Sequence, residues 1–218
     1  MPIVFVGGTD TEIGKTYTSL RLIHALRETG ASVAGYKPVA AGCEQSADGW
    51  RNEDALKLLA ASSPGLSYAQ VNPIALPDAI APHLAADNCG LRIDPDGMAA
   101  GAHALAQEYD WVIVEGAGGL LVPLTDKLTF LDWVAGQGWP CVLVVGMRLG
   151  CINHALLSAQ ALQKAGLPWA WIANRLPPLQ PWVEENEATL NQWLAGPRLH
   201  LDQNHWRKVL STLVESAC

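Results

Sequence analysis

The chain has 218 residues, half of them hydrophobic, which is enough for one sizeable core. A net charge of −7 and the lack of any basic run argue against a nucleic acid or an anionic membrane surface as a partner, and no apolar stretch approaches the ~20 residues of a membrane span. The five cysteines are scattered without a Cys-x-x-Cys pair, which argues against a zinc site and a disulfide framework and suits free thiols in a reducing cytoplasm.

In chain order, short apolar runs alternate with helical stretches. Residues 3–6 are predicted to form a buried strand, and because no basic leader precedes them we expect a cytoplasmic protein without a signal peptide. A helix is predicted over residues 15–29, with Gly30 at the usual position of a C-cap glycine. A second strand is predicted over residues 33–36.

The later elements follow the same pattern. Helices are predicted at 52–61, 96–108, 153–165, 181–194 and 205–214, and strands at 111–114, 141–145 and 169–173. Residues 62–95 are rich in Pro, Ser, Asp and Asn and are expected to form loops and short extended pieces. Continuous apolar strands alternating with helices predict an α/β fold over residues 1–218, a single domain with a parallel sheet covered by helices on both faces. Functional residues should follow the carboxyl ends of the strands.

The first strand runs into residues 8–16, Gly-Thr-Asp-Thr-Glu-Ile-Gly-Lys-Thr. A glycine-rich turn between a strand and a helix points backbone N–H groups at one spot, and the helix dipole adds positive charge there. Lys15 can reach the β- and γ-phosphates of ATP, and the Thr16 hydroxyl can ligate Mg²⁺. The Gly-x5-Gly-Lys-Thr spacing is one residue longer than usual. The strand–loop–helix context still favours a P-loop NTPase-like site over a helix N-terminus with an uninvolved lysine.

Three more candidates lie near strand ends. Glu115 ends the third informative strand and suits a Mg²⁺ ligand, and the small residues 116–119 after it let a ligand approach the backbone. Lys37 could place a second cation on the transferring phosphate oxygens, although a lysine after a strand is commonly a solvated surface residue. Asp54 could complete a Mg²⁺ site with Thr16 and Glu115, or it could only cap the helix that begins there.

The fourth strand is followed by residues 148–154, Arg-Leu-Gly-Cys-Ile-Asn-His, which open a helix. The free N–H groups at this helix start are suited to binding a carboxylate. Cys151 is interpreted as a small buried residue rather than a nucleophile, and His154 as a packing or hydrogen-bonding residue rather than a base.

Together these segments resemble the dethiobiotin synthetase family. The residues that carry the resemblance occur in the family's order and at its spacing, namely 8–16, 35–39 (Gly-Tyr-Lys-Pro-Val), 51–54 (Arg-Asn-Glu-Asp), 71–73 (Val-Asn-Pro), 115–119, 149–154 and 173–174 (Ala-Asn). They cover about the first four fifths of the chain, and the longer phosphate loop is itself a trait of that family.

The resemblance implies a homodimer that makes dethiobiotin from 7,8-diaminopelargonic acid, CO2 and ATP, with Mg²⁺. One amine of the substrate forms a carbamate with CO2. The carbamate attacks the γ-phosphorus to give a carbamic–phosphoric anhydride, and the second amine closes the ureido ring and expels phosphate.

The resemblance also implies residue roles. The catalytic residues would be Lys15, Lys37, Thr11 and Glu12, and the Mg²⁺ ligands would be Thr16, Asp54 and Glu115. The nucleotide is held by Glu12, Ile13, Gly14, Lys15, Thr16, Tyr17, Asp54, Glu115, Gly116, Ala117, Gly118 and Asn174. The diamine is held by Ala41 and Gly118, and its carboxylate by Gly150, Cys151 and Asn153 of the neighbouring subunit.

The chain departs from the family at two places. Ala41 stands where the family commonly has Ser, which leaves the affinity for the diamine open. Arg175 stands where an Asp often follows Asn174, and residues 198–202 lack the usual Gly-x-x-Pro-like turn, so the base preference is open as well.

Two other classes of protein fit the sequence less well than this family. A partitioning or septum-positioning ATPase would normally carry a basic surface or a membrane helix, which the acidic charge and the cation-poor residues 205–218 do not favour. A cobyrinic-acid-type amide synthetase would normally carry an extra glutaminase domain, for which 218 residues leave no room.

Overall fold

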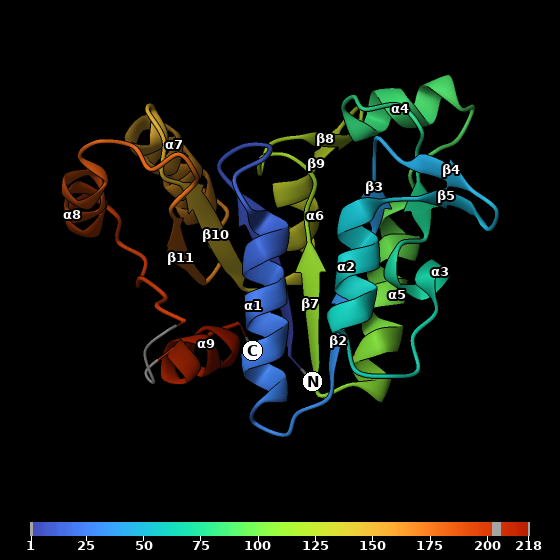
Figure 1. The fold of residues 1–218 in the computed structure, drawn as a ribbon, viewed down its shortest axis with the longest axis horizontal. Helices are drawn as coiled ribbons and strands as arrows, with labels where there is room; N and C mark the ends of the chain where they lie inside the picture. Colours follow the sequence, from blue (N-terminus) through green and yellow to red (C-terminus); the bar gives the residue numbers. More distant parts are fainter. Residues whose placement is uncertain (1, 202–205, 218) are drawn as a thin grey trace.

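The computed structural model describes residues 2–201 and 206–217 and is built on a five-stranded parallel sheet (Figure 1). Its strands, in the spatial order β11-β10-β1-β7-β2, are β11 (Trp169–Asn174), β10 (Cys141–Gly146), β1 (Ile3–Gly8), β7 (Trp111–Glu115) and β2 (Val33–Tyr36). All four pairings between neighbours are parallel. The predicted apolar runs are therefore the strands, because runs buried on both faces suit a parallel sheet.

Helices cover both faces of this sheet, as predicted. On one face lie α1 (Lys15–Arg27), α2 (Glu53–Ala61) and α9 (Trp206–Glu215), and on the other lie α5 (Pro95–Glu108), α6 (Phe130–Gln137) and α7 (Cys151–Lys164). Alternate residues of β1 divide between the two cores: Val4 and Val6 pack with α1, whereas Ile3 and Phe5 pack on the α5 side. The last α-helix of that second layer, α8 (Val183–Trp193), packs against α7.

Several short elements were missed by the prediction. The segment 62–95 holds one short extended piece of the kind expected there, β6 (Ile74–Ala75), but also two helices that were not predicted, α3 (Tyr68–Val71) and α4 (Pro82–Asn88). The helix α6 was also missed, although a capping box of Thr129 and Asp132 marks its start. The remaining strands are β3 (Val39–Ala40), β4 (Glu44–Ser46), β5 (Gly49–Arg51), β8 (Pro123–Thr125) and β9 (Leu128–Thr129). Runs of two to four residues are too short to show a hydrophobic period.

Several predicted helix boundaries shift by one to two residues. The helix predicted from 153 begins at Cys151, and the one predicted from 181 begins at Val183. The predicted first residue of the last helix, His205, lies outside the described residues, as does Asp202 of the tail segment. Within the described ranges, no helix has the length and apolar character needed to cross a bilayer.

Candidate active site

A phosphate loop joins β1 to α1 at the carboxyl edge of the sheet. Two of its residues have positive φ, Glu12 at 55° and Gly14 at 85°. The Asn174 amide nitrogen, at the end of β11, donates to the Ile13 carbonyl at 2.8 Å. A Cβ at position 14 would lie 1.9 Å from that nitrogen, so only glycine fits where the loop and β11 meet.

Lys15, the first residue of α1, points back into this loop. Its Nζ donates to the Asp10 carbonyl at 2.7 Å, and the residue is 7% exposed. Burial, followed by repulsion from Lys37, lowers the pKa of Lys15 from its ordinary 10.5 to about 8. An anionic phosphate in the loop would favour the charged form of this lysine.

Glu115 forms the centre of a buried polar cluster. Its Oε1 accepts from the Thr16 hydroxyl at 2.9 Å and pairs with Lys37 Nζ at 2.7 Å. The same Nζ lies 3.9 Å from Asp54 Oδ2. Lys37 is only 4% exposed, so it is not the solvated surface lysine that such a position commonly holds. Lys37, which follows β2, and Glu115, which ends β7, meet as the carboxyl-edge argument predicted, and Thr16 of α1 and Asp54 of α2 lie beside them.

Asn52 is the N-cap of α2, and its Oδ1 accepts from the backbone N–H of Ala55 at 3.1 Å. Asn52 therefore fills the capping role that was the alternative interpretation of Asp54. The Asp54 side chain is 42% exposed, and its carboxylate faces the Lys37 ammonium group.

These oxygens fit the ligand preference of Mg²⁺. Glu115 is fully buried, and its Oε2 has no hydrogen-bond partner among the described residues, so one carboxylate oxygen there is uncompensated. Mg²⁺ takes one or two protein carboxylates and completes its shell with water and phosphate oxygens. Thr16, Asp54 and Glu115 could supply such a donor set. In the described part of the chain, no cluster of three or more His, Cys, Asp or Glu side chains offers a self-sufficient metal cage.

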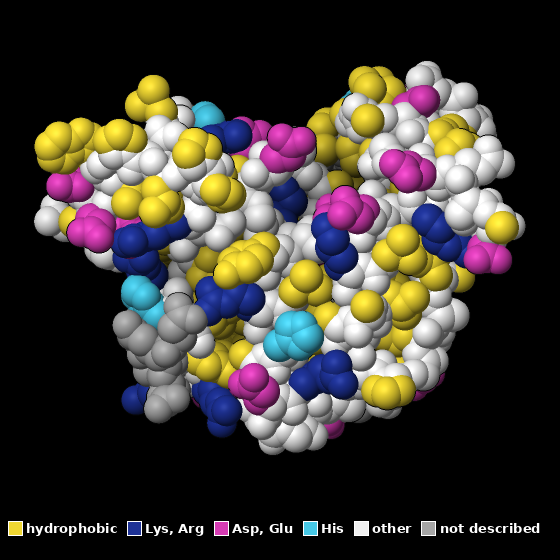
Figure 2. Space-filling view, in the orientation of Figure 1, with side chains coloured by type: hydrophobic (Ala, Val, Ile, Leu, Met, Phe, Trp, Pro, Cys, Tyr) yellow, Lys and Arg dark blue, Asp and Glu magenta, His cyan; other side chains and the backbone are white. Residues whose placement is uncertain are grey.

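A cavity of about 860 Å³ opens over this cluster. The space-filling view shows a hollow at the top of the molecule, between the part that carries α4 and the part that carries α7 and α8 (Figure 2). The predicted site residues that line the cavity are Thr11, Glu12, Gly14, Lys15, Thr16, Tyr17, Lys37, Ala41, Asp54, Ala117, Gly118 and Asn174. Ile13, Glu115 and Gly116 are not part of its lining.

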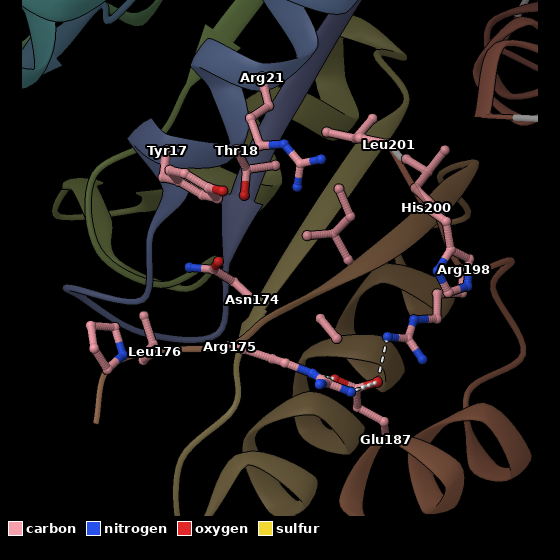
Figure 3. A pocket seen from close by; sticks show the side chains of 14 residues that line it. Tyr17, Thr18, Arg21, Asn174, Arg175, Leu176, Glu187, Arg198, His200 and Leu201 are labelled. Carbon is pink, nitrogen blue, oxygen red and sulfur yellow. Dashed lines mark hydrogen bonds and ion pairs between the residues drawn. The ribbon is translucent and has the colours of Figure 1, made fainter. Parts of the chain in front are cut away.

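A second cavity, of about 620 Å³, continues from the first past Tyr17, Asn174 and Leu176, which line both (Figure 3). Its wall holds a charged cluster that sequence reasoning missed. Arg175 Nε donates to Glu187 Oε1 at 2.8 Å, and Arg198 Nη2 donates to Glu187 Oε2 at 2.7 Å. These arginine contacts lower the pKa of Glu187 although its burial acts in the opposite direction. The cluster fixes the end of β11 against α8 and the tail.

Gly150, Cys151 and Asn153 do not line the 860 Å³ cavity within one chain. They form the start of α7, where Gly150 has a φ of 93° and the Cys151 side chain is buried. This segment connects to the phosphate loop because Arg148 forms an ion pair with Asp10. Their contact with the substrate carboxylate, expected from a neighbouring subunit, stays a prediction.

Nucleotide binding should weaken as Lys15 loses its proton. With a pKa of about 8 in the free protein, Lys15 is charged at pH 7 and largely neutral at pH 9, so we expect the Kd for ADP to rise about tenfold over that range. Calorimetric titrations at fixed Mg²⁺ measure this dependence. Arginine stays charged from pH 7 to pH 9, so the Kd of the Lys15→Arg variant for ADP should not depend on pH in this range. An equal slope in both proteins would assign the titration to another group.

A family model described as an AAA domain matches residues 3–199. The chain is 51% identical over 201 residues to the ATP-dependent dethiobiotin synthetase BioD of Pseudomonas paraeruginosa (strain DSM 24068 / PA7), covering 91% of this chain and 88% of that protein. It is 48% identical over 196 residues to ATP-dependent dethiobiotin synthetase BioD 1 of Escherichia coli O157:H7, covering 89% and 87%.

Two solved structures show the same fold. A ParA family ATPase from Chlorobium tepidum TLS superposes with a TM-score of 0.52 at 17% identity, over 99% of this chain and 90% of that one. The septum site-determining protein MinD from Pyrococcus horikoshii OT3, complexed with Mg-ADP, gives 0.53 at 18% identity, over 99% and 86%. These likenesses establish a P-loop NTPase-like fold.

Proposed function

We propose that this chain, which belongs to the ATP-dependent dethiobiotin synthetase family, forms dethiobiotin from 7,8-diaminopelargonic acid, CO2 and ATP as a step of biotin biosynthesis. The observation that carries the proposal is the convergence of Lys15 and Lys37 on one cavity. They follow different strands, and each is less than a tenth exposed. Two buried ammonium groups around one space suit a reaction that brings an anionic nucleophile to an anionic phosphoryl group.

The reaction begins when one substrate amine adds to CO2 and loses a proton, which gives a carbamate anion. A carbamate oxygen attacks the γ-phosphorus, ADP leaves, and a carbamic–phosphoric anhydride forms. The second amine then attacks the carbonyl carbon, loses a proton and expels phosphate as the ring closes. Lys15 and Lys37 would offset the charge that gathers between carbamate and phosphate, and Thr11 and Glu12 would line the reacting space.

Thr16, Asp54 and Glu115 would hold Mg²⁺, which supplies charge neutralisation on the β- and γ-phosphate oxygens. Support comes from the uncompensated Oε2 of Glu115 and from the hydrogen bond between Thr16 and Glu115. The remaining nucleotide contacts would come from the loop around Gly14 and from Asn174, beside which the second cavity opens.

On the substrate side, Ala41 and Gly118 line the cavity near Lys37 and would contact the diamine. Gly150, Cys151 and Asn153 of a second copy would bind its carboxylate, in a homodimer located in the cytoplasm. Residues 1–218 would act as one catalytic domain in each copy. Free Cys43, Cys89, Cys141 and Cys151 are consistent with a reducing compartment.

Base discrimination should be weak. The side chains best placed to read a base already make other contacts: the Asn174 amide nitrogen donates to the loop, which leaves its oxygen to meet a base, and Arg175 and Arg198 pair with Glu187. Rejection of a wrong base requires polar site groups that the wrong base would leave unpaired. We therefore expect kcat/KM for GTP, CTP and UTP to lie within about tenfold of that for ATP, a gap of about 1.4 kcal/mol.

Steady-state rates with each triphosphate, at fixed Mg²⁺ and saturating diamine, measure this selectivity. A preference for ATP above about a hundredfold, or ~2.7 kcal/mol, would overturn weak discrimination and indicate adenine contacts in the tail.

The activity itself is tested by mass analysis of the products with each substrate omitted in turn. We expect dethiobiotin only when the diamine, bicarbonate as a source of CO2 and ATP are all present, with one ADP per ring formed. ADP release that is independent of the diamine, without dethiobiotin, would contradict the proposal.

A further inference from the structure

We infer that Tyr68 and Asn72 are positioning residues, which fix Lys37 and Asp54 relative to each other through a partly buried hydrogen-bond relay. This rests on the proposed function, in which those two side chains flank the transferring phosphoryl group. Neither Tyr68 nor Asn72 lines the 860 Å³ cavity, so any effect on the reaction passes through other residues.

One end of the relay holds the backbone of Lys37. The Asn72 amide nitrogen donates to the Lys37 carbonyl at 2.6 Å, and the Lys37 N–H donates to the Val71 carbonyl at 2.8 Å. Both backbone groups of Lys37 are thereby tied to residues 71 and 72, which come from a different part of the chain. The position from which the Lys37 side chain extends is set by this segment.

The other end of the relay holds the start of α2. The Tyr68 hydroxyl donates to Asn72 Oδ1 at 2.9 Å and accepts from the backbone N–H of Asn52 at 2.8 Å. Asn52 is the N-cap of the helix, and Asp54 lies in its first turn. One hydroxyl therefore connects the residue that holds Lys37 with the turn that carries Asp54, whose Oδ2 lies 3.9 Å from Lys37 Nζ.

Local structure keeps the two relay residues in place. Tyr68 is the first residue of α3, and a capping box formed by Ser67 and Gln70 caps the N-terminus of this helix. The guanidinium of Arg51 stacks on the Tyr68 ring, 4.2 Å from its centroid. Asn72 is 3% exposed and precedes Pro73, which disfavours helical backbone there. Burial raises the pKa of Tyr68, so its hydroxyl keeps the proton that it donates to Asn72.

The Tyr68→Phe variant tests this role, because the ring still fills its space while the connecting hydroxyl is gone. Small displacements of catalytic groups are costly, so we expect kcat for dethiobiotin formation to fall at least about tenfold. The KM for the diamine should change less than about twofold, because no diamine contact is removed. The Mg²⁺ concentration that half-saturates ADP binding, measured by calorimetry, should rise at least about threefold because Asp54 is displaced.

Tyr109→Phe is the matched control. Its hydroxyl likewise donates one hydrogen bond, to the backbone carbonyl of Pro64 at 3.3 Å, but it does not belong to the relay. In Tyr109→Phe we expect kcat and the half-saturating Mg²⁺ concentration to stay within about twofold of the unmodified protein, even if the melting temperature changes. If Tyr68→Phe behaves like Tyr109→Phe in kcat and in Mg²⁺ dependence, the relay is only structural and the inference fails.

A second variant, Asn72→Asp, keeps the acceptor for Tyr68 and removes the donor to Lys37. Its effect on Mg²⁺-dependent ADP binding should not add to that of Tyr68→Phe, because both act through one chain of bonds. Full additivity would contradict the relay, and if Asn72→Asp does not fold, Tyr68→Phe and its control decide alone. Absence of dethiobiotin formation by the unmodified protein would contradict the proposed function. The Mg²⁺ dependence of ADP binding in the variants would still show whether the relay positions Asp54.

Discussion

Replacing Lys37 by Ala or Met is expected to lower kcat about 10²–10³-fold, the usual cost of removing one preorganised charge contact from a transition state. The side chain is nearly buried and its ammonium pairs with Glu115 at 2.7 Å, so its position is set before substrate binds. Lys37→Met retains the length of the side chain and isolates the loss of charge. Steady-state kinetics of dethiobiotin formation measure the effect.

Lys57→Ala is the control for this loss. Lys57 lies on α2, one turn after Asp54, where it pairs with Glu53 at the surface. Removing such an exposed pair should leave kcat within about twofold of the unmodified protein. Surface ion pairs contribute at most about 1 kcal/mol to stability, and this pair does not contact the reacting groups. Unchanged kcat in a folded Lys37→Met protein would remove Lys37 from the mechanism.

Glu115→Gln is expected to raise the Mg²⁺ concentration for half-maximal activity at least about tenfold, or ~1.4 kcal/mol of ion binding. The variant keeps the shape of the side chain but loses the negative charge that pairs with Lys37 and that would bind the metal. Asp54→Asn should act in the same direction and by less, because this carboxylate is 42% exposed. Titration of activity with Mg²⁺ at saturating ATP gives both values.

The matched control is Glu53→Gln, which changes the residue next to Asp54 without reaching the cluster. Its carboxylate pairs with Lys57 and is 81% exposed. We expect its Mg²⁺ dependence to match that of the unmodified protein. If Glu115→Gln and Asp54→Asn also match it, the two acids are structural and the metal is held elsewhere.

The fold and the centre of the site follow from the sequence because both depend on long, regular signals. The five apolar runs predict a parallel sheet, which places all strand carboxyl ends at one edge, and in the observed order the ends of β1, β7 and β2 are neighbours. Lys15 and Lys37 follow two of those ends and Glu115 forms the third, so their placement at one edge could be predicted without any knowledge of side-chain packing.

The Tyr68–Asn72 relay and the Glu187 cluster could not be predicted in this way. Tyr68 and Asn72 lie in a segment without helical or strand period, and their roles depend on a four-residue helix, α3. Glu187 meets Arg175 and Arg198 only because the tail pairs with the edge strand β11 at Trp171. Such a contact is set by the tertiary fold of residues 175–199, and no spacing in the sequence encodes it.

The most direct test of the account follows oxygen from CO2 into phosphate. In the proposed reaction the carbamate oxygen that attacks phosphorus leaves with phosphate when the ring closes. CO2 carrying heavy oxygen, supplied in ordinary water and quenched before exchange, should therefore yield phosphate with one heavy oxygen and a labelled dethiobiotin carbonyl. Phosphate whose new oxygen comes from water would indicate simple ATP hydrolysis, as in a nucleotide switch, and would contradict the synthetase assignment.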